Sequence, residues 1–173
     1  MTIAKTISVL NQMQADGVIN DYAIGDAVGA TFYIEPAATL DVDVFVHFET
    51  IPGSLLITPK PINDYLSSKG CRVEGEYVHV EGWPVRFLPP DGPLIEEAID
   101  EAVSTDVEGA PTRVFSAEHL VAIALKTGRA KDKARILQFV ESGVLDADRL
   151  QAVLKHHDLL DLWERFERQF FAE

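Results

Sequence analysis

The spacing of apolar residues along the chain changes between a helical period and a strand period. Residues 3–15 repeat apolar positions every three or four residues, which predicts a helix. Residues 40–48 read L-D-V-D-V-F-V-H-F, an alternation rich in β-branched and aromatic residues that predicts a strand. The same criteria predict further strands at 21–25, 71–80 (a hairpin), 83–88 and 112–115, and helices at 27–33, 61–69 and 94–103.

The pattern after Ser116 is helical throughout. Breaks at Thr127-Gly128, Gly143 and His157-Asp158 divide this region into four helices. The sequence therefore predicts an α/β (α+β) fold with two parts. Residues 1–110 form a mixed sheet flanked by helices, and residues 111–173 form a C-terminal helical bundle that packs on it.

The composition is that of a globular protein. The chain has 173 residues, of which 47% are hydrophobic and 25% charged, so it is long enough to bury a core. Its single cysteine, Cys71, excludes an internal disulfide and fits a reducing compartment. The sequence lacks an apolar run long enough for a membrane span, and its first residues lack the pattern of a signal peptide. We expect a cytoplasmic protein.

The net charge of −13 is unevenly distributed. Residues 1–110 hold 5 basic and 18 acidic residues, whereas residues 111–173 hold 10 of each. Such an acidic field argues against non-specific binding to DNA or other nucleic acid. Five basic residues fall within 126–135, where they form either a patch that faces an acidic site or a solvated helical face.

Asp41 and Asp43 are the main candidates for chemistry. Side chains alternate along a strand, so these two carboxylates share one face, roughly 6.5–7 Å apart along the backbone. Two oxygen ligands at this spacing suit Mg²⁺ or Mn²⁺, which would neutralise their mutual repulsion. The alternative interpretation is an exposed strand face with solvated aspartates. In addition, the short strand that ends at Gly25 leads into a helix, whose first N–H groups are free to hold a phosphate.

Two blocks of sequence carry a resemblance to a known superfamily. The first reads A-I-G-D-A-V from Ala23 and continues to Y-I-E-P-A-A-T-L-D-V-D at Asp43. The second reads S-A-E-H-L-V-A-I-A-L-K from Ser116, followed by Gly128-Arg129 and Lys131-Asp132. These blocks resemble the nucleotidyltransferase fold superfamily related to DNA polymerase β, and most nearly its small AbiEii-toxin-like members. The resemblance spans about residues 20–140.

The resemblance implies a set of roles for named residues. Asp41 and Asp43 would hold Mg²⁺ or Mn²⁺, and with Lys126 and Asp132 they would form the catalytic set. The nucleotide would be bound by Gly25, Asp26 and Lys131. For Lys126 the alternative is a surface lysine at a helix end, and for Asp132 it is a helix-capping acid. The implied substrate is a nucleoside triphosphate (NTP), and the implied reaction transfers a nucleotidyl group to a protein or RNA acceptor.

The sequence departs from the superfamily pattern at three positions. Asp26 replaces the second glycine of the first block, and Ala37 replaces an arginine that often follows the proline. Active enzymes place a third carboxylate on a later strand, where the matching stretch 83–88 offers Arg86. If this strand lies beside the aspartates, Arg86 is expected to face them and take the place of the metal.

Two functions therefore remain open. One is a metal-dependent nucleotidyltransferase. The other is a catalytically degenerate binding or regulatory protein of the same fold, in a toxin–antitoxin context. The five histidines show no metal-ligand spacing, and His156-His157 are expected to face different ways on a helix. An aromatic stripe near the end is expected to be core or the interface of a homodimer; it comprises Trp163, Phe166, Phe170 and Phe171.

Overall fold

The computed structural model describes residues 2–35, 41–48 and 58–171. Eight helices are present in this part of the chain: α1 (Ile3–Ala15), α2 (Asp26–Ala30), α3 (Lys60–Ser68), α4 (Pro93–Asp100), α5 (Ala117–Thr127), α6 (Ala130–Ser142), α7 (Ala147–His156) and α8 (Leu160–Phe170). Seven strands accompany them: β1 (Tyr22–Gly25), β2 (Val42–Val46), β3 (Arg72–Glu74), β4 (Tyr77–Val80), β5 (Trp83–Leu88), β6 (Val103–Val107) and β7 (Ala110–Val114).

All seven strands belong to one mixed sheet in the order β3-β4-β5-β2-β1-β7-β6. The central pair, β1 and β2, is antiparallel, and each of these strands has a parallel neighbour on its other side, β7 and β5 respectively. The predicted mixed sheet flanked by helices is confirmed. The predicted boundary at residue 110 coincides with the first residue of β7, so the sheet continues to Val114.

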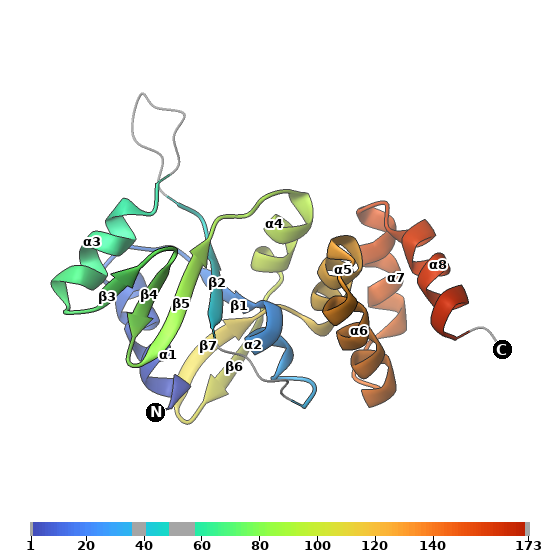
Figure 1. Ribbon diagram of the computed structural model, residues 1–173, viewed down its shortest axis with the longest axis horizontal. Coiled ribbons are helices and arrows are strands. Elements are labelled where there is room, and N and C mark those ends of the chain that lie inside the picture. Colours follow the sequence, from blue (N-terminus) through green and yellow to red (C-terminus); the bar gives the residue numbers. More distant parts are fainter. Residues whose placement is uncertain (1, 36–40, 49–57, 172–173) are drawn as a thin grey trace.

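The alternation predicted for β2 decides which side chains reach each face of the sheet. Val42, Val44 and Val46 are fully buried in a core that α1 and α3 cover. Asp43 and Phe45 point to the opposite face, because successive side chains of a strand alternate. That face is covered by α4 and α5, with α6, α7 and α8 behind them. Figure 1 shows these C-terminal helices gathered at one end of the molecule, away from α1 and α3.

The helical tail is confirmed as four helices, and two of their boundaries follow from single residues. Ser116 caps α5, because its hydroxyl accepts a hydrogen bond from the backbone N–H of His119. The same helix ends at Gly128, which has a φ of 71° and so adopts the left-handed conformation that favours glycine. In the aromatic stripe, Trp163 and Phe166 are buried core residues, as expected for one of the two interpretations.

One strand was not anticipated from the sequence. The helix predicted over 94–103 ends at Asp100, and Val103 already belongs to β6. β6 is an exposed edge strand with the sequence V-S-T-D-V, so its polar side chains hide the apolar alternation that marks a strand. Leu40, Ala37 and the turn expected at Pro52-Gly53 lie outside the described residues. Within the described ranges, no helix is long and apolar enough to cross a membrane.

Candidate functional site

The site is built where β1 ends and α2 begins. Gly25, the last residue of β1, pairs directly with Asp43 on β2. A side chain at Gly25 would meet two aromatic rings, because a Cβ atom there would lie 2.7 Å from Phe45 and 2.8 Å from Phe115. Glycine is therefore required for close packing at this position. The role of Gly25 in binding phosphate remains a prediction.

Arg86 neutralises Asp43. β5 runs parallel to β2, and the register places Arg86 directly opposite Asp43. The guanidinium donates two hydrogen bonds, from Nε to Oδ1 and from Nη2 to Oδ2, each 3.0 Å long. The Asp43 side chain is only 4% exposed, so its charge needs this partner. The expectation that Arg86 faces the aspartates is confirmed for Asp43.

A second carboxylate lies beside Asp43, and it comes from Asp26. Asp26 begins α2 with a φ of 49°, and its carboxyl group is close enough to that of Asp43 to influence the Asp43 pKa. Burial raises the pKa of Asp43 to about 6, and Asp26 adds to this rise while Arg86 opposes it. Burial acts on Asp26 in the same direction. For Asp26, however, Arg135 outweighs the effect of burial. Its Nη1 donates a hydrogen bond of 2.9 Å to Asp26, and this bond together with the arginine's charge lowers the pKa of Asp26. Each carboxylate is thus balanced by its own arginine.

The third acid–arginine pair lies at the start of α6. Asp132 accepts the backbone N–H of Arg129 at 3.2 Å and the Nε of the same residue at 2.6 Å. Asp132 lies at the third helical position, where its carboxylate caps the start of α6 by accepting the backbone N–H of Arg129. The structure therefore shows Asp132 in the helix-capping position that was the alternative to a catalytic role.

These three pairs surround one pocket of about 220 Å³ between the sheet and helices α5 and α6. Its charged lining consists of the three arginines 86, 129 and 135 and of four aspartates at 26, 43, 91 and 132. Apolar side chains from the sheet and from α5, among them Phe45, Phe115 and Leu120, form the remaining wall. The pocket can hold a small molecule that has both an apolar face and polar groups.

Among the described residues that line this pocket, four of the predicted site residues are missing: Gly25, Asp41, Lys126 and Lys131. Asp41 precedes β2, and its carboxylate accepts a hydrogen bond from the hydroxyl of Tyr77 at 3.4 Å. Lys126 and Lys131 are exposed, and neither lines the pocket. The structure therefore groups Asp43 with Asp26 and Asp132, and leaves Asp41 and both lysines apart from them.

The arrangement does not fit the magnesium or manganese site expected from Asp41 and Asp43. Both oxygens of Asp43 are bound by Arg86, and a guanidinium cannot lose its proton to make room for a cation. Asp41 is turned toward Tyr77, as its hydrogen bond shows.

Sequence reasoning missed two arginines of the pocket, Arg129 and Arg135. Both belong to the basic stretch 126–135, for which a patch facing an acidic site was one of the two interpretations. The sequence could not show that Arg135 would reach Asp26, because 109 positions separate them along the chain.

Comparison with solved structures supports the fold. A nucleotidyltransferase-like antigenic protein from Paracoccidioides brasiliensis superposes with a TM-score of 0.56 at 16% identity, covering 99% of this chain and 97% of that one. The antibiotic-resistance factor ANT(2'')-Ia, solved in complex with adenylyl-2''-tobramycin, gives a TM-score of 0.52 at 13% identity, with 93% and 98% coverage. The protein has a nucleotidyltransferase-like fold. A solution structure of ANT(2'')-Ia agrees, with a TM-score of 0.51 at 12% identity and coverage of 99% and 100%.

The fold was thus correctly anticipated, while the closer likeness to AbiEii-like proteins remains a prediction. No protein-family model matches the sequence, and no curated protein matches it.

Proposed function

We propose that this protein is a catalytically silent, ligand-binding member of the nucleotidyltransferase fold. The observation that carries the proposal is the bidentate pair of hydrogen bonds from Arg86 to Asp43. In the resembling enzymes a later strand supplies a third carboxylate to the metal site. β5 runs beside β2 and presents Arg86 at the residue opposite Asp43. A fixed cation thus takes the place in which those enzymes hold a metal ion.

The pocket supports binding of part of a nucleotide. A volume of about 220 Å³ lies below the range of roughly 300–1,000 Å³ typical of sites for whole cofactors. It suits a base or a ribose phosphate better than a complete NTP. The arginines 86, 129 and 135 would meet polar or anionic groups, and the apolar wall beside Phe45 and Phe115 would meet a flat ring. Binding would need no metal ion.

Metal-dependent nucleotidyl transfer to a protein or RNA acceptor is the second candidate. It is favoured by the contact between Asp26 and Asp43, which brings two carboxylates together in the pocket. For this pair to bind a cation, Arg86 would have to leave Asp43. A homodimer and a toxin–antitoxin context remain predictions from the sequence.

A transfer assay separates the two candidates. The purified protein is incubated with each α-labelled NTP and Mg²⁺ or Mn²⁺, with its own chain, total RNA or casein as acceptor. Binding of the unlabelled nucleotide is measured in parallel without metal. The proposal expects metal-independent binding and no transfer of label. The proposal would be overturned by transfer in the wild-type protein that is lost in Asp43→Asn and retained in Asp64→Asn, since Asp64 is an exposed aspartate on α3.

A further inference from the structure

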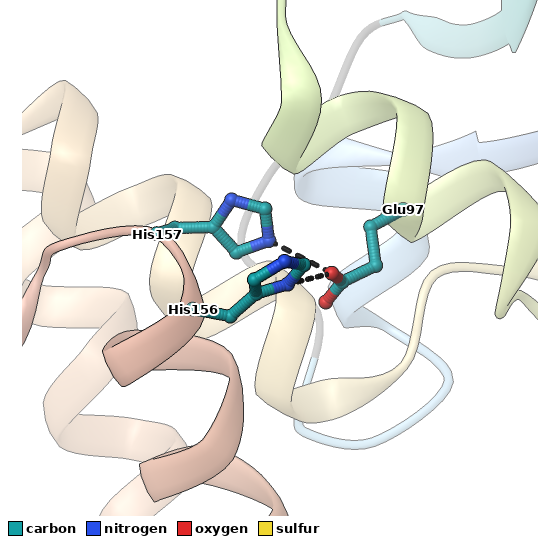
Figure 2. A group of neighbouring side chains, drawn as sticks. All are labelled: Glu97, His156 and His157. Carbon is teal, nitrogen blue, oxygen red and sulfur yellow. Dashed lines mark hydrogen bonds and ion pairs between the residues drawn. The ribbon is translucent and has the colours of Figure 1, made fainter.

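We infer a second, separate site on this protein, in which Glu97, His156 and His157 bind Zn²⁺. Figure 2 shows the two imidazoles converging on the carboxylate of Glu97. His156 Nδ1 lies 2.5 Å and His157 Nε2 lies 3.0 Å from the same oxygen, Oε2. The three potential ligand atoms lie within 4.8 Å of one another. This inference does not depend on the proposed function.

Two adjacent histidines can share one carboxylate because the helix stops between them. His156 is the last residue of α7, and His157 is its C-cap with a φ of −109°. The backbone change turns the second imidazole back toward the first, and their ring centroids lie 4.6 Å apart. The expectation that these side chains face different ways is therefore wrong, since it assumed a continuous helix.

A buried pair of residues fixes the orientation of Glu97. His119 is fully buried, and its Nε2 lies 2.9 Å from Glu97 Oε1, the oxygen that the other histidines do not contact. Its Nδ1 lies 2.7 Å from the hydroxyl of Ser116. When Nε2 carries the proton and donates it to Glu97, the hydroxyl donates to Nδ1. Hydrogen-bonded partners of this kind hold a ligand carboxylate in place in metal sites.

The ligand set and its surroundings favour a transition metal. Two imidazole nitrogens and one carboxylate oxygen leave a fourth position open, which is the pattern of zinc sites that keep a bound water. His156 is 70% exposed and borders an open groove of about 720 Å³. That groove also presents Glu96, Asp100 and Glu101, and none of its lining residues in the described ranges is Lys or Arg. Arg149 lies 3.6 Å from Glu101, so Glu96 and Asp100 supply most of the negative charge that attracts cations here.

Glu97 presents one carboxylate oxygen, Oε2, to both His156 and His157. When the metal binds, the nitrogens that face Glu97 lose their protons or exchange them for the other ring position.

The metal would tie two regions of the chain together. Glu97 lies on α4, between β5 and β6, whereas both histidines lie at the end of α7 in the C-terminal helices. A ligand that binds only the folded protein raises its stability. At 100 times its Kd, Zn²⁺ is expected to raise the melting temperature by about 5–10 °C in a chain of this size.

Zinc titration of matched variants tests the inference. Every protein carries Cys71→Ser, which removes the only thiol. Calorimetry with Zn²⁺ is expected to give one site per chain in this parent, and Co²⁺ is expected to give the visible absorption of a four-coordinate ion. His156→Gln and Glu97→Gln are each expected to weaken Zn²⁺ binding at least tenfold. His79→Gln is the control, because His79 pairs with Glu74 at 3.0 Å but belongs to no group of three potential metal ligands among the described residues.

Three outcomes would overturn the inference. The first is that the parent does not bind Zn²⁺ stoichiometrically. The second is that the His156→Gln and Glu97→Gln variants bind Zn²⁺ as tightly as the parent. The third is that Asp43→Asn abolishes binding while both of those variants retain it. Because the His156 side chain is largely exposed, its substitution leaves the fold intact, and the comparison does not depend on the more buried His157.

Discussion

Asp43 and Glu97 are both largely shielded carboxylates, with side chains 4% and 17% exposed, and each is surrounded by basic groups. The kind of basic group differs. Asp43 is bound by a guanidinium, which stays protonated at any pH the fold survives. Glu97 is bound by imidazoles, whose ring nitrogens can bind a metal ion in place of a proton. This difference is the reason why we propose a metal site at Glu97 and none at Asp43.

The largest loss of stability is expected when Arg86, the partner of Asp43, is replaced. Arg86→Met leaves a buried carboxylate without a partner, and we expect it to lower the free energy of unfolding by about 3 kcal/mol. Urea denaturation measures this change. Arg72→Met is the matched control, because Arg72 and its partner Glu74 are exposed, and it should stay within about 0.5 kcal/mol. Equal losses in both variants would mean that the Arg86 pair contributes no more than a surface pair.

The next largest loss of stability is expected at one of two glycines, Gly25 beside Asp43 and Gly92 beside Glu97. Gly25→Ala forces a methyl group against Phe45 and Phe115, and we expect a loss of about 1–3 kcal/mol in thermal or urea unfolding. Gly92 lines the groove beside Glu97, has open space around it and an extended φ of 169°. Gly92→Ala is therefore expected to cost less than about 1 kcal/mol. A reversed order would contradict the packing described around Gly25.

A smaller loss of stability is expected when Glu97, which contacts three histidines, is replaced. Glu97→Gln keeps the shape of the side chain but removes the charge that His119, His156 and His157 share. We expect it to lower the free energy of unfolding in metal-free buffer by about 1–2 kcal/mol. Glu96→Gln is the neighbouring control, since the Glu96 side chain is half exposed and its carboxylate lies 3.5 Å from the exposed His47. If both substitutions have the same effect, the three histidines are not held by Glu97.

The smallest effect concerns the lysines that the resemblance placed in a catalytic site. Lys126→Ala and Lys131→Ala are each expected to change the free energy of unfolding by less than about 0.5 kcal/mol, because both side chains are exposed. Neither substitution should change nucleotide affinity, because neither lysine lines the pocket. A clear loss of affinity in Lys126→Ala, measured by calorimetry, would restore the role that the sequence suggested.

The sequence predicted those parts of the fold that depend on local pattern. The alternation around Val42, Val44 and Val46 predicted the central strand and the direction of Asp43, because burial enforces the period of two. The exposed edge strand β6 was missed, since its side chains are mostly polar. The position of Arg86 followed from the resemblance, which placed its strand beside the aspartates, and the register confirms it.

The two centres were predicted less well, because they form between distant segments. Arg135 reaches Asp26 across 109 positions, and His157 reaches Glu97 across 60. No spacing rule for ligands covers such separations. The convergence of His156 and His157 depends on a backbone change at one residue, which a periodic helix pattern does not contain.

Titration of Mn²⁺ into protein that carries His156→Gln tests the central claim most directly, because this substitution disables the proposed zinc site. With Arg86 intact, the account predicts no binding at the Asp43 centre. Adding Arg86→Asp should create a site, since a ligand replaces a competing cation, and Asp43→Asn should abolish that site again. Tight Mn²⁺ binding while Arg86 is intact, weakened by Arg86→Asp and lost in Asp43→Asn, would contradict the account.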